Sequence, residues 1–225
     1  MKALLRKAKD RVSGRMASFV VMARELGARD LVADPNTPDV LEAGAGVSWD
    51  AALAFFNQHG FGGGWGERTR AAGHRCFVVT HPDDGRVIAG SWLAYRPEWV
   101  HEIGYLFDCG GDGCYVFGDF VEPASRGRWL QSKLARHRLG VAARDGRRWV
   151  YGLVWEGNLP SLKNCERAGL VRAGKVSGRY VGWWQRDQVE RLAADVGVGR
   201  FVTRAGQELA GAAWRWRYDP ERGAA

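Results

Sequence analysis

The segment 121–134 holds the side chains of this sequence that are best suited to bind an anion. Pro123 stops strand pairing where a β-rich run ends. Arg126, Gly127 and Arg128 follow it and lead into a helical pattern. The first N–H groups of a helix lack backbone partners and carry a partial positive charge, and the two guanidinium groups strengthen that field. The turn therefore predicts a binding site for a polyphosphate.

A second polar segment follows the next strand. The run 149–155 is apolar enough to be a buried strand, and Asn158 comes shortly after it. The helical pattern at 128–144 joins this strand to the preceding one, which predicts a right-handed parallel crossover over 115–155. In such a crossover the carboxyl ends of adjacent strands open onto one crevice, where ligands bind. We therefore expect Val121 and Asn158 to flank one cleft.

The elements that position these segments follow from the hydrophobic period and from the turn residues. The expected helices, at helical spacing of apolar residues, cover 49–59, 128–144, 161–168 and 183–194. The expected strands cover 76–80, 87–95, 101–107, 115–121, 149–155, 171–181 and 200–204. The first four strands form two antiparallel hairpins with glycine-containing turns. This order predicts an α/β (α+β) fold with a central mixed, mostly antiparallel sheet, flanking helices and one parallel strand–helix–strand crossover.

Composition limits the class of protein. The chain has 225 residues, of which 46% are hydrophobic and 26% charged, as in folded globular proteins rather than disordered ones. Its longest apolar runs are far below the roughly 18 residues of a membrane-spanning helix. No secretory signal is recognisable in residues 1–15, so we expect a cytoplasmic location. The four cysteines form no CxxC pair and lack zinc-ligand spacing, which predicts reduced thiols and no metal site.

The charge balance suggests a polyanionic partner. Thirty-three Lys and Arg against 25 Asp and Glu leave a formal net charge of +8. This charge suits a nucleotide cofactor, a nucleic acid or an anionic membrane surface, and the alternative is that the excess arginines only solvate the surface. Residues 1–15 form a basic amphipathic pattern, which fits peripheral membrane contact or a solvated first helix. The basic residues are spread rather than striped, which argues against a nucleic-acid-binding surface.

Taken together, these motifs resemble the GNAT superfamily of acyl-CoA-dependent N-acyltransferases. The family pattern has Val-x-Pro, then Gln/Arg-x-x-Gly-x-Gly/Ala, and later Asn-x-x-Ser/Ala and a Tyr-Glu-Lys-x-Gly-Phe ending. The corresponding segments here are Val121-Glu122-Pro123, 126–131, Asn158-Leu159-Pro160-Ser161, and 165–170. The resemblance spans about residues 70–181. It implies a cytoplasmic acetyltransferase or related acyltransferase that moves an acyl group from acetyl-CoA or another acyl-CoA to a small-molecule amine acceptor.

The resemblance also assigns residues to cofactor binding. They are Phe120, Val121, Arg126, Gly127, Arg128, Trp129, Leu130, Gln131, Ser132, Asn158 and Ser161. Trp129 and Gln131 stand at the two positions where the family has small residues in its pyrophosphate loop. Small residues there let the backbone amides approach phosphate, whereas the indole of Trp129 obstructs that approach unless its ring swings away.

Direct acyl transfer needs an unprotonated amine, so a carboxylate, or a water that it orients, has to accept a proton. Alternation along a strand places Phe117, Asp119 and Val121 on one face. Asp119 is the candidate base, and the alternative is a structural salt bridge. Cys165 stands where the family often has a tyrosine that protonates the leaving thiolate, and the alternative is a buried helix cysteine. Further candidates for the base are Glu122, Glu102 and His101.

The acceptor pocket is the part that the sequence specifies least. The resemblance builds it from the segment before the hairpins and the segment after residue 181. Trp65 and the pair 183–184 are candidates for its walls, whereas the tryptophans of the predicted strands fill the core. His74 and His81 flank a predicted strand and are expected to be solvated.

Two other functions fit the same sequence. A GNAT-fold protein that has lost catalysis and serves as a binding or regulatory module would explain Trp129, Gln131 and Cys165. A basic nucleic-acid-binding protein would explain the net charge of +8. For domain organisation, the expected parts are an N-terminal helix-plus-loop segment at 1–47, an acyltransferase core at 48–181 and a C-terminal extension at 182–225.

Overall fold

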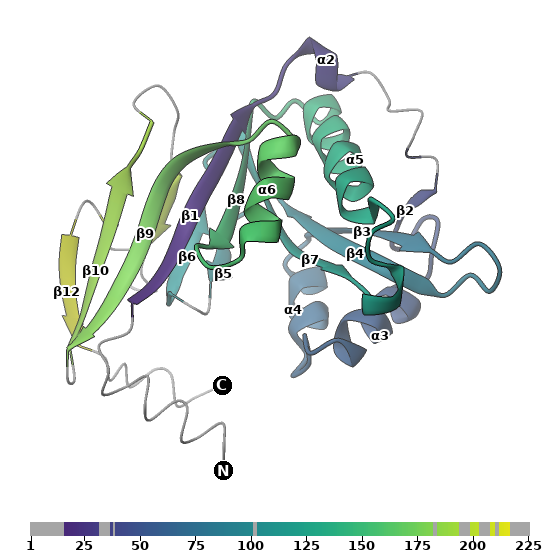
Figure 1. Ribbon diagram of the computed structural model, residues 1–225, viewed down its shortest axis with the longest axis horizontal. Helices are drawn as coiled ribbons and strands as arrows, with labels where there is room; N and C mark the ends of the chain where they lie inside the picture. The colour runs from purple at the N-terminus through teal and green to yellow at the C-terminus, as the bar shows by residue number, and fades with distance from the viewer. Residues whose placement is uncertain are drawn as a thin grey trace.

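The computed structural model describes residues 16–31, 37, 39–100, 103–181, 184–193, 199–202, 208–209 and 212–216. Most strands in this part of the chain join one large sheet (Figure 1). Its members are β1 (Met16–Glu25), β2 (Val40–Glu42), β3 (Arg75–Thr80), β4 (Val87–Ala94), β7 (Gly113–Val121), β8 (Trp149–Trp155), β9 (Val171–Val181), β10 (Trp184–Arg191) and β12 (Ala212–Trp216). From edge to edge they run β12-β10-β9-β1-β8-β7-β4-β3-β2. Neighbouring strands are antiparallel except for β7 and β8, which are parallel.

Helices cover both faces of β3, β4 and β7. They are α2 (Ala28–Leu31), α3 (Trp49–Gln58), α4 (Trp65–Ala71), α5 (Leu130–Arg144) and α6 (Leu159–Arg167). Figure 1 shows α5 and α6 on one side of these strands and α3 and α4 on the other. Leu134 and Leu162 belong to the buried cluster under α5 and α6, and Phe56 packs on Trp92 of β4 under α3. In the described part of the chain, no helix is long and apolar enough to cross a membrane.

The helix ends follow the sequence signals. The Ser48 side chain accepts a hydrogen bond from the Ala51 N–H and caps α3. The Asn158 side chain accepts one from the Ser161 N–H at the start of α6. Gly169 follows α6 with a φ of +84°, which a glycine adopts without strain. The structure confirms the predicted helices at 49–59, 128–144 and 161–168, the β3–β4 hairpin, the strand at 171–181 and the parallel crossover β7–α5–β8.

A small sheet stands where the second hairpin was expected. Its strands are β5 (Glu98–Val100), β6 (Tyr105–Asp108) and β11 (Arg200–Val202), in the order β11-β6-β5. The predicted pairing of 101–107 with 115–121 is therefore wrong, because β7 pairs with β4 and β8 instead. β7 carries apolar side chains on both faces. A central position in the large sheet buries both faces, which explains this pairing. Phe107 of β6 packs against Tyr151 of β8, so the small sheet covers one face of the large one.

The predicted helix at 183–194 is also wrong, because residues 184–191 form β10. Several of its residues favour a helix, but β10 pairs with β9 on one side and with β12 on the other, and these long-range pairs override the local preference. The Tyr105 hydroxyl donates a hydrogen bond to the buried Asp187 carboxylate at 2.7 Å, which ties β10 to the small sheet. The strand predicted at 200–204 is present as β11.

The segment 1–47, expected to contain a helix and a loop, contributes two strands that the sequence analysis missed. β1 lies between β8 and β9 and pairs antiparallel with both, and β2 extends the sheet beside β3. The apolar run 19–23 is the sequence signal for β1, and its residues 20–23 are buried. The helix predicted at 1–15 lies outside the described residues. The division of the chain after residues 47 and 181 stays a prediction.

A bulge in β7 reverses the direction of its side chains. Relative to β4, β7 has one extra residue between Phe117 and Phe120. Gly118 lies in this interval with a φ of +62°, a left-handed conformation that favours glycine. Phe117 therefore packs beside Trp92, whereas Asp119 faces α5. The predicted common face of Phe117 and Asp119 is wrong for this reason.

The pairing of β7 with β8 ends early. Its parallel register stops with Val116 opposite Gly152. Beyond that point β7 runs on to Val121, whereas β8 continues beside β1. Among the described residues, the edge of β7 that faces β8 has no strand partner over 117–121, so the two strands part toward their carboxyl ends.

The bulge predicts that Gly118 is unusually sensitive to substitution. A Cβ at residue 118 would lie 2.8 Å from the Trp65 ring and 2.9 Å from the Trp92 ring. We expect Gly118→Ala to lower the free energy of unfolding by about 2–4 kcal/mol, because a left-handed φ and an overpacked core both oppose the methyl group. Gly85→Ala is the control, since its φ is +69° but open space surrounds it, and we expect it to cost about 1 kcal/mol. Urea titration measures both, and equal losses would contradict the packing argument.

Candidate active site

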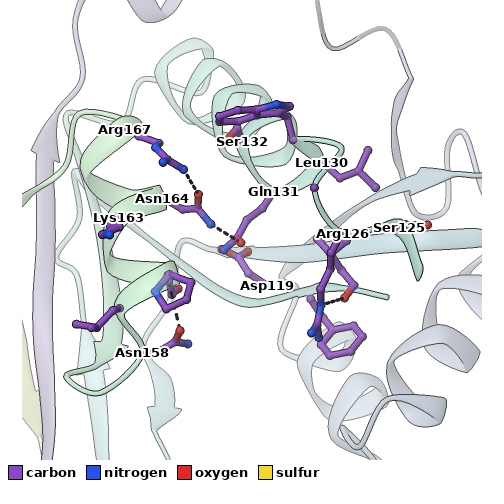
Figure 2. Close-up of a pocket in the computed structure, with 17 residues that line it drawn as sticks. Asp119, Ser125, Arg126, Leu130, Gln131, Ser132, Asn158, Lys163, Asn164 and Arg167 are labelled. Atoms are coloured by element: carbon purple, nitrogen blue, oxygen red, sulfur yellow. Dashed lines mark hydrogen bonds between the residues drawn. The ribbon is translucent and has the colours of Figure 1, made fainter. Parts of the chain in front are cut away.

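A cavity of about 810 Å³ opens where β7 and β8 part. Its walls come from the end of β7, the turn after it, the first turn of α5, and α6 (Figure 2). Most residues that the resemblance assigns to cofactor binding line this cavity: Phe120, Val121, Arg126, Gly127, Trp129, Leu130, Gln131, Ser132, Asn158 and Ser161. Arg128 does not line it. Of the two predicted catalytic residues, Asp119 lines the cavity and Cys165 does not.

The turn into α5 leaves a run of backbone N–H groups without partners. Within the described residues, the N–H groups of 127–132 donate no hydrogen bond to the protein, and the first bond into α5 joins the Lys133 N–H to the Trp129 carbonyl at 3.0 Å. Gly127 has a φ of +80°, and the space that a Cβ would occupy is open. Unpartnered amides at the first turn of a helix favour a bound anion. The backbone therefore has the arrangement that a polyphosphate needs.

Cationic side chains surround these amides. Arg126, Lys163 and Arg167 line the cavity. The Arg126 Nε donates to the Val121 carbonyl at 3.4 Å, which holds its guanidinium near the end of β7 (Figure 2). Among the described lining residues, Asp119 carries the only carboxylate, and that carboxylate is already paired with an arginine. The cavity as a whole is therefore electropositive.

The cavity is open although Trp129 lines it. The Trp129 side chain is largely open to solvent, with 64% of the residue exposed, and the Arg167 guanidinium lies 5.4 Å from the centre of its ring. Trp129 has a φ of +60° and is the only non-glycine residue of the described chain in the left-handed region. That conformation costs a non-glycine residue about 1–2 kcal/mol. Strain of this kind is concentrated at functional sites, and here it lies at the mouth of the cavity.

The Asp119 carboxylate forms a two-pronged ion pair with Arg138 of α5. The Arg138 Nη1 lies 2.8 Å from Asp119 Oδ1, and Nη2 donates to Oδ2 at 3.0 Å. Only 2% of the Arg138 side chain is exposed, against 24% for Asp119, and Nη1 also donates to the Trp92 carbonyl at 3.0 Å. A buried guanidinium needs such acceptors. These contacts support the structural alternative for Asp119, while its role as base stays a prediction.

Cys165 lies in a separate small cavity between α5 and α6. That cavity, of about 30 Å³, also borders Asp119, Gln131 and Asn164. The Asn164 Nδ2 donates to the Gln131 Oε1 at 2.7 Å, which joins the two helices (Figure 2). Burial, and after it the negative charge of Asp119, raises the pKa of the Cys165 thiol to about 12. The thiol therefore keeps its proton near neutral pH and is a weaker acid than an ordinary thiol, so its role as general acid stays a prediction.

The open edge of β7 offers a hydrogen-bond donor to the cavity. The Glu122 N–H donates to the Ile88 carbonyl of β4 at 2.9 Å. Successive residues of an antiparallel strand turn their N–H groups to opposite edges. The Val121 N–H therefore points to the edge that faces β8, where no strand of the described chain accepts it. The Glu122 carboxylate itself accepts hydrogen bonds from Arg86 and Ser125, which lower its pKa and engage it in the turn rather than in the cavity.

A second cavity, of about 480 Å³, lies on the other face of β7, beside the bulge. Gly118 borders it, and Trp65, which the sequence proposed as a pocket wall, does too. Arg68 and Glu98 are its charged lining residues in the described chain. The other proposed wall residues, 183–184, and the candidate bases at 101–102 lie outside the residues whose side chains the structure describes.

Glu98 pairs with a buried histidine that the sequence analysis expected to be solvated. The His74 Nε2 lies 2.7 Å from the Glu98 Oε2, and the His74 side chain is 1% exposed. That expectation is wrong because His74 packs beside Phe117, with the two rings 5.8 Å apart, under the small sheet. Neither residue belongs to a sequence motif, so only the spatial contact marks the pair. In the described chain, no group of three or more His, Cys, Asp or Glu side chains is arranged to hold a metal ion.

Solved structures share this arrangement of strands and helices. A protein from Novosphingobium aromaticivorans assigned to the GNAT family of acetyltransferases is 17% identical, and the match covers 73% of this chain and 64% of that one with a TM-score of 0.55. This is the GNAT fold. A GCN5-related N-acetyltransferase from Sphaerobacter thermophilus is 16% identical, with 87% and 59% of the two chains covered and a TM-score of 0.52. The predicted fold class is confirmed.

Other solved structures share this fold at still lower sequence identity. A conserved protein of unknown function from Staphylococcus epidermidis has the same fold at 10% identity and a TM-score of 0.51, with 79% of this chain and 66% of that chain covered. The sequence matches no protein-family profile and no curated protein. The chain covers 56–64% of the length of the first three solved structures. Activity and substrates therefore rest on the chemistry of the two cavities.

The ion pair predicts that Asp119→Asn destabilises the protein. The amide leaves the buried Arg138 charge without a compensating anion, so we expect the free energy of unfolding to fall by about 2 kcal/mol. Urea titration measures the loss, and Asp83→Asn, at an exposed carboxylate, is the matched control. An unchanged unfolding midpoint together with a large loss of turnover would instead identify Asp119 as a base without a structural role.

The buried thiol predicts a loss of stability at high pH. The ordinary pKa of the thiol is 9.0 and its pKa in the folded protein is about 12. Between these values the unfolded chain loses the Cys165 proton while the folded protein keeps it, so the free energy of unfolding falls by about 1.4 kcal/mol per pH unit. Well below pH 9, where the unfolded chain also keeps this proton, the effect is absent. Urea titrations from pH 8 to 11 should show a shallower fall for Cys165→Ala, and identical slopes would contradict the burial of the thiol.

Proposed function

We propose that this protein is an N-acyltransferase that moves an acyl group, most simply acetyl, from an acyl-CoA to a small-molecule amine. One observation carries the proposal: the unpartnered edge of β7 runs between an electropositive cavity on one face and a mainly aromatic cavity on the other. A polyanionic cosubstrate and an amine can therefore reach the same stretch of backbone from opposite faces. The bulge at Gly118 marks the place where they would meet.

The residues of the large cavity fit the diphosphate of coenzyme A. The free N–H groups of 127–132 supply donors, and Arg126 adds a full charge beside them. The exposed indole of Trp129 leaves the cavity open, which removes the obstruction that the sequence alone suggested. When bound, the cosubstrate supplies an activated thioester. The Val121 N–H is the donor that the open edge of β7 offers to a developing oxyanion.

Two observations support a second function, in which the protein does not catalyse acyl transfer. The candidate base Asp119 is engaged by Arg138, and the candidate acid Cys165 is a weak acid in a small cavity of about 30 Å³. A binding or regulatory protein that holds an acyl-CoA without turning it over is therefore the alternative. Free-thiol release from acetyl-CoA in the presence of pooled amines distinguishes the two, since the alternative binds coenzyme A and releases no thiol.

The proposal predicts a selective effect of Arg126→Ala. Loss of a charge-assisted hydrogen bond to phosphate should raise the Kd for coenzyme A about tenfold. Arg29→Ala, at an exposed position on α2, is the control and should leave the Kd within twofold. Isothermal titration measures both values, and thermal shift reports the stabilisation by coenzyme A. Equal affinities of the two variants would place the anion site elsewhere, and no binding to the wild type would contradict coenzyme A as the bound group.

A further inference from the structure

We propose that Glu98 is the group that takes the proton from the acceptor, and that the acceptor is a primary monoamine on an aromatic or other apolar body. The inference deepens the proposed function and rests on it. Glu98 carries the only carboxylate among the described residues that line the 480 Å³ cavity. An acid that borders the amine side of β7 is better placed for this role than Asp119, which faces α5.

The two cavities border adjacent residues of β7 at its bulge. Residues 119–121 border the large cavity, and residues 117–118 border the small one. A cosubstrate that runs along the open edge of β7 therefore brings its reactive end to the Glu98 side of the strand. This contiguity lets one proton acceptor in the small cavity serve a reaction at the edge of the large one.

The His74 ring holds the Glu98 carboxylate in place. The His74 Nε2 lies 2.7 Å from Glu98 Oε2, and 16% of the Glu98 side chain is exposed against 1% for His74. The His74 Nδ1 is buried and has no hydrogen-bond partner among the described residues, so a hydrogen there would have no acceptor. We therefore assign the hydrogen to Nε2, from which it is donated to the carboxylate. His74 is a positioning residue, because it acts through Glu98.

The other walls of the cavity define the class of acceptor. They are largely aromatic: Phe19, Phe61, Trp65, Trp99, Tyr115 and Phe117. Aromatic faces attract both an ammonium group and an apolar body. Glu98 can pair with one ammonium group, whereas Arg68 repels a second one. This charge pattern favours a monoamine with an aromatic or apolar body over a polyamine.

The proton and the bonds balance without a further reactant. The Glu98 carboxylate takes one proton from the bound R–NH₃⁺, which frees the nitrogen lone pair. That nitrogen forms a bond to the thioester carbonyl carbon, and the carbon–sulfur bond breaks with its electron pair left on sulfur. The second nitrogen proton is lost as the amide forms, and a proton is taken up by the thiolate. The products are an N-substituted amide and free coenzyme A, with one net proton released from Glu98 to solvent.

The test compares Glu98→Gln with Glu67→Gln. Glu67 is an exposed carboxylate of α4 that lies outside both cavities, so its variant is the matched control. With acetyl-CoA and phenethylamine, we expect kcat to fall about 100-fold for Glu98→Gln and to stay within twofold for Glu67→Gln. The affinity for coenzyme A, from isothermal titration, should be the same for both. Phenethylamine should also be acetylated faster than spermidine.

A binding readout separates this inference from the proposed function. Trp65 and Trp99 line the cavity, so phenethylamine should change the tryptophan fluorescence, and Glu98→Gln should raise its Kd about tenfold. If the wild type releases no thiol, the proposed function fails. The two Kd values for phenethylamine then show whether the cavity binds an amine through Glu98. Equal Kd and kcat for the two Glu→Gln variants would overturn the assignment of Glu98. A preference for spermidine would overturn the acceptor class.

The positioning role of His74 has its own readout. His74→Gln keeps a nitrogen donor for the Glu98 carboxylate, whereas His74→Leu removes it. We expect the glutamine variant to retain at least tenfold more kcat than the leucine variant, compared at equal amounts of folded protein. Equal kcat values would mean that the histidine serves packing only.

Discussion

The buried guanidinium of Arg138 joins the three elements on which the site depends. From α5 it reaches the Trp92 carbonyl of β4 and the Asp119 carboxylate of β7. Trp92 lies where the β4–β7 register shifts, and Asp119 follows the bulge directly. A buried cation is tolerated only with acceptors around it, and without the bulge Asp119 would not face α5. The bulge, the course of α5 and the position of the open edge therefore depend on one another.

The bulge also separates two kinds of chemistry on one strand. On one face, free amides and cations surround a cavity suited to phosphate, in which the Asp119 carboxylate is already paired with Arg138. On the other face, aromatic rings surround a cavity suited to an amine, and its charged lining residues are Glu98 and Arg68. β7 separates the two cavities, yet its backbone borders both of them.

Trp129 shows how a departure from a motif can mislead when only residue types are known. A tryptophan at a position that suits glycine looks like an obstruction, because its volume exceeds the space beside a phosphate. In the folded chain its backbone takes the left-handed conformation that a glycine would take, and the indole lies beside Arg167. The backbone geometry of the turn is retained at a cost of about 1–2 kcal/mol in conformational strain.

The sequence was enough to predict the turn after β7, the helix that follows it and the β–α–β crossover. Each of these depends on residues close together in the chain, such as Pro123 and Gly127, so local rules predict them. The place of β1 between β8 and β9, the strand β10 and the His74–Glu98 pair became known only from the three-dimensional structure. Strand partners and side-chain contacts of this kind join residues far apart in the sequence. Their free energy comes from burial and pairing in three dimensions, which no local pattern records.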